Sequence, residues 1–270
     1  MGKPKRLPVA LTIAGSDSGG GAGIQADLKT FSALEVHGTS VVTCVTAQNP
    51  RAVRGIHPCP PAFVHDQLEA VFSELPPQAV KTGMLFSGAL VRTVARFLSR
   101  RRGIPLVLDP VMVSTSGTRL LKPAAVEILL SELAPLATLV MPNMEEAELL
   151  AGEKLRTEED LRTAARSIHA LLGCAVLVKG GHLRAGRDAV DVLYDGKHEL
   201  QMAAPYIRGI RTHGTGCTFS AAVTSFLAKG LPLPEAAHQA KGYITNAIAQ
   251  HYLAAGHAVL NHRIETLAQK

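Results

Sequence analysis

The sequence predicts an α/β protein with a mostly parallel central sheet covered by helices on both faces. Short apolar runs rich in β-branched residues alternate with segments of helical period along most of the 270-residue chain. The apolar runs contain no regular polar positions, which indicates strands that are buried on both faces. Alternation of such strands with helices favours parallel pairing through right-handed crossovers.

Six apolar runs predict strands, and the segments between and after them predict helices. The predicted strands are 9–14, 40–46, 79–82, 105–109, 138–142 and 175–179. The predicted helices are 24–35, 61–75, 87–102, 123–133, 145–151, 157–172, 217–229 and 234–253. In the helix 157–172, acidic residues fill the first turn and a glycine follows the last residue, both typical of helix ends.

A different pattern follows the sixth predicted strand. Segments 189–194 and 199–203 flank Asp195-Gly196, a dipeptide typical of tight turns, and predict a small antiparallel hairpin. The chain shows no internal repeat, low-complexity tract or linker. We therefore expect a single domain over residues 1–270.

Composition and charge argue against several classes of protein. Hydrophobic residues make up 47% of the chain and charged residues 19%, which supplies a core that a disordered chain lacks. Aromatic residues make up only 4%, with no Trp, and the net charge of +6 is scattered, so we expect no nucleic-acid partner. We expect the excess of positive charge to attract anionic small molecules weakly.

The sequence also predicts a cytoplasmic protein without membrane contact. Four cysteines without C-x-x-C spacing are too few for a disulfide scaffold of this length, so a reducing cytosol is the default. The apolar stretch 9–14 is preceded by basic residues but is too short for a signal peptide. No window approaches the roughly 18 apolar residues that a membrane span needs.

Polar residues and glycines recur where the predicted strands end. In an open α/β sheet, ligands bind beyond the carboxyl ends of the strands, so these residues predict one composite site. They are Gly15-Ser16-Asp17, Gln48-Asn49, Gly83-Met84, Asp109-Pro110-Val111, Asn143 to Glu146, and Lys179-Gly180-Gly181-His182.

The first of two glycine-rich loops covers residues 15–23. It lacks the Gly-Lys-Ser/Thr of a Walker A loop and the spacing of G-x-G-x-x-G. Two interpretations stay open: a turn that lets the next helix pack closely on its strand, or a backbone that approaches a ligand closely because glycine has no Cβ. In the second interpretation Asp27, one turn into the helix, points its carboxylate back toward the loop.

The second loop, 213–216, opens the apolar helix 217–229. The free N–H groups of such a helix start and the positive end of the helix dipole together form an anion site. Cys217 lies in the first turn, where a helix N-terminus lowers the pKa of a thiol toward neutrality and favours the thiolate. The alternative is a buried structural cysteine.

Seven motifs appear in order along the chain: AGSDSGGGAGIQAD at 14–27, TAQN at 46–49, KTGM at 81–84, DPVM at 109–112, PNMEEAE at 142–148, VKGGH at 178–182 and GTGC at 214–217. With these motifs the chain resembles, over nearly its whole length, the hydroxymethylpyrimidine phosphate kinases of thiamine biosynthesis, in the ribokinase superfamily. The resemblance implies a three-layer αβα sandwich, ATP, Mg²⁺ and a homodimer, and it leaves a monovalent cation open.

The resemblance also implies roles for individual residues. Cys217 matches the catalytic base that takes the hydroxymethyl proton; most of the superfamily has Asp at this position. The backbone amides of Gly214, Thr215 and Gly216 match those that hold the transferring phosphoryl group. The pyrimidine pocket is matched by Gly15, Asp27, Gln48, Met84 and Val111.

On the nucleotide side, Lys179 matches a residue that meets the ATP phosphates, and Asp109 one that supports the phosphates and the metal. Asn143 and Glu146 match an Asn-x-x-Glu motif that organises Mg²⁺ through water. Such a set suits phosphoryl transfer, where positioning and charge neutralisation carry most of the catalysis. Mg²⁺ keeps several waters and needs only one or two carboxylates.

The implied pyrimidine fits the chemistry of Gln48. Its amide offers one acceptor and one donor, which match the amino group and the adjacent ring nitrogen of an aminopyrimidine. A site that pairs both groups penalises ligands that lack either one. We therefore expect phosphorylation of 4-amino-5-hydroxymethyl-2-methylpyrimidine and of its monophosphate.

Alternatives remain at several positions. Glu146 is also explained as an acid at a helix start, Met84 as core filling, and His182 and His213 as hydrogen-bonded structural histidines. For the whole protein, the alternatives are a pyridoxal kinase of the same fold and a non-catalytic nucleotide-binding regulator. The chain also departs from the family at 209–211, where Gly-Ile-Arg replaces the usual Thr-Lys-Asn.

Overall fold

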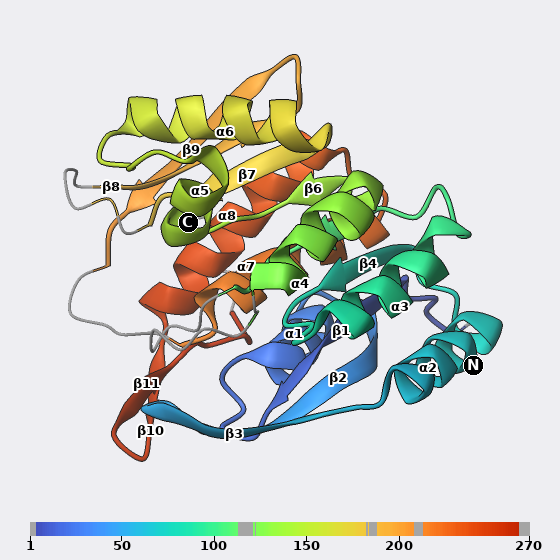
Figure 1. Cartoon of the computed structure of the whole chain (residues 1–270). Coiled ribbons are helices and arrows are strands. Elements are labelled where there is room, and N and C mark those ends of the chain that lie inside the picture. The colour runs from blue at the N-terminus through green and yellow to red at the C-terminus, as the bar shows by residue number, and fades with distance from the viewer. Residues whose placement is uncertain are drawn as a thin grey trace.

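A nine-stranded sheet runs through the centre of the fold, with helices on both faces (Figure 1). The computed structural model describes residues 4–112, 121, 123–181, 183, 188–207 and 213–264. The strand order is β3-β2-β1-β4-β5-β6-β7-β8-β9, and a separate two-stranded sheet is formed by β10 and β11.

Six neighbouring strands of the large sheet pair in parallel, as the alternation of strands and helices predicts. In spatial order they are β2 (His37–Asn49), β1 (Val9–Asp17), β4 (Ala79–Thr82), β5 (Leu106–Leu108), β6 (Leu139–Val140) and β7 (Ala175–Lys179). The side chains of β4, β5 and β6 are buried throughout, because helices cover both faces of these strands. Parallel pairing brings the carboxyl ends of all six strands to one edge of the sheet.

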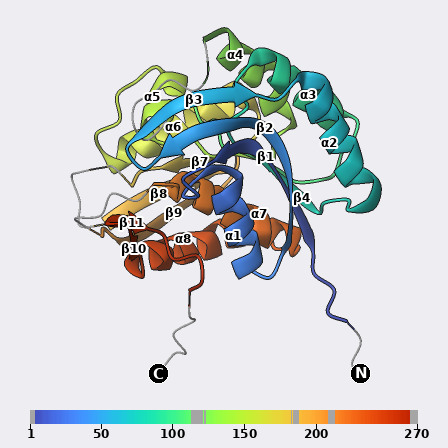
Figure 2. The ribbon, with the colours of Figure 1, turned by 90° about the horizontal axis from the view of Figure 1, so that it is seen from below.

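The helices form two layers (Figure 2). Each layer has its own apolar core. One layer contains α2 (Pro61–Glu74), α3 (Gly88–Ser99), α4 (Pro123–Ile128), α5 (Met144–Ala151) and α6 (Glu158–Leu172). The opposite layer contains α1 (Gly23–Ala33), α7 (Thr215–Ala228) and α8 (Leu233–Ala249). The three-layer αβα arrangement is thereby confirmed. Within the described ranges, no helix is both long enough and apolar enough to cross a lipid bilayer.

Local signals in the sequence explain the ends of several helices. Thr157 forms a capping box with Asp160 at the start of α6, and Gly173 ends that helix in the left-handed conformation. The predicted helix 123–133 is only partly α-helical, because Leu129–Leu133 winds as a π-helical turn after α4.

Three antiparallel strands extend the edges of the sheet. The predicted hairpin is confirmed as β8 (Asp188–Tyr194) and β9 (Glu199–Pro205), and β8 pairs with β7. At the other edge, β3 (Ala52–Pro58) pairs with β2 and was not predicted. Most side chains of β3 are exposed, so the strand has no apolar run that would reveal it.

The last predicted helix is too long. It ends at Ala249, and the next residues form a hairpin of β10 (Tyr252–Ala254) and β11 (His257–Val259). The two central residues of this hairpin, Ala255 and Gly256, have φ of 49° and 79°. Positive φ at both positions is typical of the type I′ turns that join tight hairpins. A turn with alanine in the left-handed region is hard to foresee from sequence, because glycine or asparagine is the usual residue there.

Candidate active site

The two glycine-rich loops meet beyond the carboxyl edge of the sheet. Gly214 has a φ of 86°, and a Cβ built on it would lie 1.8 Å from the carbonyl oxygen of Gly21. A Cβ on Gly23 would lie 2.4 Å from the carbonyl oxygen of Gly15. No side chain fits at either position, so these glycines permit close approach of one backbone segment to another. At Gly23 this supports the interpretation of the first loop as a turn that packs closely on its own strand.

Asp17, at the end of β1, organises the first loop. Its carboxylate accepts hydrogen bonds from the backbone N–H groups of Gly19, Gly21 and Ala22 at 2.8, 3.1 and 2.9 Å. Burial alone would raise the pKa of Asp17, but hydrogen bonds from His213, Gly19 and Ala22 hold it below its usual value. An ionised carboxylate therefore fixes the path of the loop.

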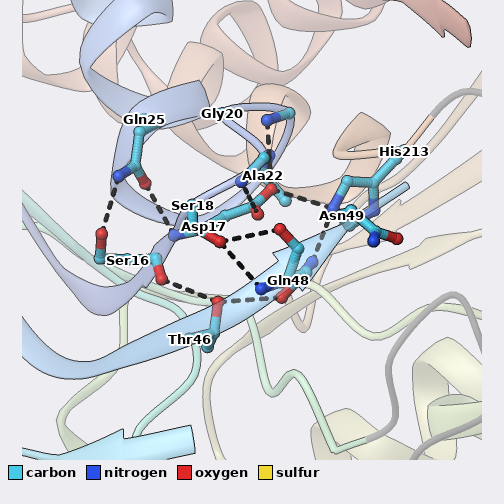
Figure 3. A network of polar contacts seen from close by, with 12 residues as sticks. Ser16, Asp17, Ser18, Gly20, Ala22, Gln25, Thr46, Gln48, Asn49 and His213 are labelled. Carbon is cyan, nitrogen blue, oxygen red and sulfur yellow. Dashed lines mark hydrogen bonds and ion pairs between the residues drawn. The ribbon is translucent and has the colours of Figure 1, made fainter. Parts of the chain in front are cut away.

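His213 connects this loop to the end of β2 (Figure 3). Its Nε2 lies 3.1 Å from Oδ2 of Asp17 and 2.9 Å from the side-chain amide of Gln48. The other end of that amide lies 3.2 Å from Oγ1 of Thr46. The Ser18 hydroxyl donates to the carbonyl oxygen of Gln48 and accepts from its backbone N–H, both at 2.8 Å. Gln48 is thus held in place through its main chain and its side chain.

Among the other residues predicted for the pyrimidine pocket, Gly15 and Met84 lie together. A Cβ on Gly15 would lie 2.8 Å from Sγ of Cys44 and 3.6 Å from Sδ of Met84. Val111 has a φ of 45°, a left-handed conformation that is unusual for a β-branched residue and often occurs at functional positions. Contact of these residues with a pyrimidine stays a prediction.

Asp27 does not face the first loop as expected. Its side chain is fully buried, Lys81 donates to its Oδ1 at 2.7 Å, and Thr12 donates to its Oδ2 at 2.6 Å. In this structure the Asp27 carboxylate is the partner of a buried lysine, and its contact with a substrate stays a prediction. Burial alone would lower the pKa of Lys81, but the neighbouring Asp27 carboxylate raises it, so the ammonium form is favoured.

Cys217 lies in the first turn of α7, as predicted, but its thiol is not activated in this structure. Burial raises the pKa of the thiol to about 11; the Lys81 ammonium and a hydrogen bond from the N–H of Gly23 lower it only in part. The thiol pKa is thus raised and not lowered toward neutrality as expected, and the role of Cys217 as a base stays a prediction. The loss of hydration outweighs the helix dipole and the local cation.

A second lysine lies at the helix start itself. A Cβ on Gly216 would lie 3.4 Å from Nζ of Lys179, which donates to Oδ1 of Asp109 at 2.9 Å. Ser220 of α7 donates to the other carboxylate oxygen of Asp109 at 3.1 Å. Burial alone would lower the pKa of Lys179, but the charges of Asp109 and Glu146 raise it. A cation therefore lies beside the N–H groups of α7, as an anion site requires.

The Asn143-x-x-Glu146 motif forms a capping box at the start of α5. The Asn143 side chain accepts from the N–H of Glu146, and Oε2 of Glu146 accepts from the N–H of Asn143, both at 2.9 Å. The other oxygen, Oε1, accepts from the N–H of Met112 at 2.9 Å. The helix-start interpretation of Glu146 is thereby confirmed. The carboxylate also joins α5 to the segment after β5, and a role toward a metal stays a prediction.

Sequence reasoning missed the role of Lys81 and the pairing of Asp17 with His213. Lys81 lies in the motif KTGM, and the signal that could have revealed it was a charged residue inside a strand predicted to be buried on both faces. Asp17 was expected in the composite site and His213 as a structural histidine, but their pairing depends on the contact between the two loops and leaves no local signal. His182 and the atypical segment 209–211 lie outside the described residues.

Taken together, the site is that of a phosphotransferase. A helix N-terminus beside a lysine suits a transferring phosphoryl group, and the role of Cys217 toward an alcohol stays a prediction. The chain belongs to the phosphomethylpyrimidine kinase family, whose model matches residues 17–262.

Individual relatives agree with the family. A hydroxymethylpyrimidine/phosphomethylpyrimidine kinase from Synechococcus elongatus is 48% identical, over 93% of this chain and 94% of its own. The thiamine biosynthesis bifunctional protein ThiED of Geobacter sulfurreducens is 53% identical over 93% of this chain; the match spans about half (51%) of that longer relative.

Solved structures show the same fold. The pyridoxal kinase of Bacillus subtilis in complex with ADP superposes with a TM-score of 0.87 at 39% identity, covering 96% of this chain and 98% of that one. The phosphomethylpyrimidine kinase of Clostridium difficile superposes with a TM-score of 0.79 at 43% identity, covering 89% of this chain and 99% of that one.

Proposed function

We propose that the protein uses ATP to phosphorylate 4-amino-5-hydroxymethyl-2-methylpyrimidine and then its monophosphate. One observation carries the proposal: His213 joins Gln48, the amide suited to an aminopyrimidine, to the loop that opens α7. A pyrimidine bound by Gln48 would therefore lie next to the N-terminus of α7, where a phosphoryl group is best stabilised. The named relatives support the same substrate class.

In this proposal the N–H groups at the start of α7 and the Lys179 ammonium hold the transferring phosphoryl group. Their dipoles and charge are fixed before the reaction, so they stabilise the developing charge without reorganising. Cys217 receives the proton of the substrate hydroxyl. Its raised thiol pKa means that the thiolate is scarce in the free protein, so proton transfer occurs as the phosphoryl group is transferred and asks little of the base.

Mg²⁺ is proposed as the companion of the ATP phosphates, and the donor set of the described residues fits that role only through water. No group of three or more His, Cys, Asp or Glu side chains in the described part of the chain is arranged to hold a metal. Glu146 and Asp109 keep free lone pairs on their carboxylates and would accept hydrogen bonds from metal-bound waters. When bound, the ion neutralises charge on the phosphates.

The test is an ADP-release assay with three acceptors: the aminopyrimidine alcohol, its monophosphate and pyridoxal. We expect both pyrimidines to be phosphorylated and pyridoxal to be a poorer substrate, because its ring carries a phenol and has no amino group next to a ring nitrogen for Gln48 to pair. Gln48→Ala should raise KM for the pyrimidine alcohol and leave KM for ATP almost unchanged, at a cost of about 1–3 kcal/mol in pyrimidine binding. Equal effects on both KM values would remove Gln48 from the pocket.

Pyridoxal kinase is the second candidate, because pyridoxal kinases are among the solved structures that this fold resembles. A higher kcat/KM for pyridoxal than for either pyrimidine would favour it over the first proposal. The single domain, the homodimer and the cytoplasmic location remain predictions, testable by limited proteolysis, light scattering and cell fractionation.

A further inference from the structure

The hydrogen bonds around Gln48 determine which end of its amide is oxygen and which is nitrogen. In Figure 3 the amide nitrogen of Gln48 faces Nε2 of His213 and the amide oxygen faces Oγ1 of Thr46, at 2.9 and 3.2 Å. The two ends of an amide are alike in shape, so their assignment depends on what surrounds them. Both neighbours favour the opposite assignment.

The first neighbour is His213, whose Nε2 lies 3.1 Å from the Asp17 carboxylate. The Asp17 carboxylate accepts hydrogen bonds from three backbone N–H groups, those of Gly19, Gly21 and Ala22, which favour its ionised form. A bare nitrogen lone pair cannot face that carboxylate, so Nε2 of His213 carries a hydrogen. Protonated Nε2 has no lone pair that could accept from the NH₂ group of Gln48, so the Gln48 atom beside it is the amide oxygen, which shares the hydrogen with Asp17.

The second neighbour is Thr46, whose hydroxyl has one hydrogen. The carbonyl oxygen of Ser16 lies 3.0 Å away and can only accept, so that hydrogen is assigned to it. A lone pair of the hydroxyl oxygen then faces Gln48, and only the NH₂ end of the amide can bond to it. Two independent neighbours therefore fix the same orientation, with oxygen toward His213 and nitrogen toward Thr46.

Among the hydrogen bonds of the described residues, this orientation leaves one oxygen lone pair and one N–H of the amide unused, side by side. A 4-aminopyrimidine presents an amino donor next to a ring-nitrogen acceptor and pairs with the amide as it stands. A 4-oxopyrimidine presents an acceptor next to an N–H donor, the reverse order. The 4-oxopyrimidine can pair only if the Gln48 amide turns by 180°. That turn would place the NH₂ group of Gln48 against the N–H of His213.

We infer that His213 is a specificity-determining residue, which locks the amide of Gln48 so that the site selects 4-aminopyrimidines over 4-oxopyrimidines. His213 acts through Gln48 and is itself kept in the required form by Asp17. The inference rests on the proposed function, because it assumes that Gln48 reads the pyrimidine edge.

The experiment compares kcat/KM for the 4-amino alcohol and its 4-oxo analogue. Wild type should prefer the amino compound by about 100-fold or more, since mismatched buried hydrogen-bond groups give strong rejection. His213→Phe keeps a ring of similar size but removes the N–H, so the amide can turn. We expect the preference to fall at least about tenfold, mainly because kcat/KM for the oxo compound rises.

Two variants and a matched control separate specificity from damage to the fold. His213→Gln can return a donor near the position of Nε2 and should restore much of the preference. Thr46→Val removes the second fixed neighbour and should lower the preference, even if His213→Phe fails to fold. Ser18→Ala is the control, since Ser18 bonds only to the main chain of Gln48 and should leave the preference unchanged.

The outcomes distinguish this inference from the proposed function. If wild type fails to phosphorylate the amino compound, the proposed function is wrong. If wild type is active and selective but His213→Phe and Thr46→Val lose activity on both compounds equally, the inference is overturned and His213 only holds the loops together.

Discussion

Replacement of Lys81 by methionine tests whether the buried lysine is both a structural and an electrostatic element of the site. Methionine has nearly the same length, so Lys81→Met removes the charge with little change in volume. The Asp27 carboxylate would then be buried with Thr12 as its remaining hydrogen-bond donor among the partners seen in the structure. Removal of one member of a buried ion pair costs about 3–5 kcal/mol. We expect a loss of this size in the free energy of unfolding, measured with urea at neutral pH.

The same substitution should alter Cys217. The Lys81 ammonium lowers the pKa of this thiol, which burial has raised to about 11. Lys81→Met should therefore raise that pKa further and slow alkylation of Cys217 at any given pH, followed by mass spectrometry of the Cys217 peptide. In wild type, a pKa about two units above that of an ordinary thiol already implies roughly a hundredfold less thiolate at neutral pH.

Lys241 provides a matched control within the chain. It is also buried, and it donates to Oδ2 of Asp191 at 2.7 Å, but it is not among the charges that act most strongly on Cys217. Lys241→Met should cost similar stability and leave the alkylation of Cys217 unchanged. The double variant Lys81→Met/Asp27→Asn leaves no unpaired charge of this ion pair buried. It should therefore recover part of the free energy of unfolding that Lys81→Met alone loses. A loss below about 1 kcal/mol in Lys81→Met, or an unchanged alkylation profile, would refute the reasoning.

Three further predictions follow from single carboxylates and the thiol. Asp17→Asn should destabilise the protein by about 1–3 kcal/mol at neutral pH. Folding lowers the pKa of Asp17, so the difference in unfolding free energy between wild type and variant should be complete above the ordinary pKa of 3.8 and should shrink as the pH falls below it. Urea unfolding at pH 3–7 measures this difference. A constant difference over that range would contradict an ionised Asp17 carboxylate that holds the loop. Glu146→Gln should raise the Mg²⁺ concentration needed for half-maximal rate with little effect on pyrimidine KM; an unmoved Mg²⁺ dependence would leave Glu146 as a capping residue alone. Cys217→Ser should lower kcat by about 10²–10⁴ with KM values little changed, and Cys217→Asp should retain more activity than Ser; nearly full kcat in the serine variant would assign the thiol to packing.

The order of elements could be predicted because it depends on local patterns. Apolar runs such as 79–82 and 175–179 coincide with β4 and β7, since a strand covered on both faces needs apolar side chains at almost every position. The Asp195-Gly196 turn located the hairpin of β8 and β9 for the same local reason. The strand β3 escaped prediction because its pairing with β2 is its main stabilising contact, and backbone pairing leaves little trace in the side chains.

The sequence by itself determined the parallel sheet, the composite site at its carboxyl edge and the resemblance to pyrimidine kinases. Each of these depends on residue types and on their order along the chain. Only the tertiary structure decided the electrostatics of the site. The raised thiol pKa of Cys217, the burial of Asp27 against Lys81 and the joining of Asp17, His213 and Gln48 all depend on distances between segments far apart in the sequence. Burial and close charges set a pKa, and neither is encoded by the neighbours of a residue along the chain.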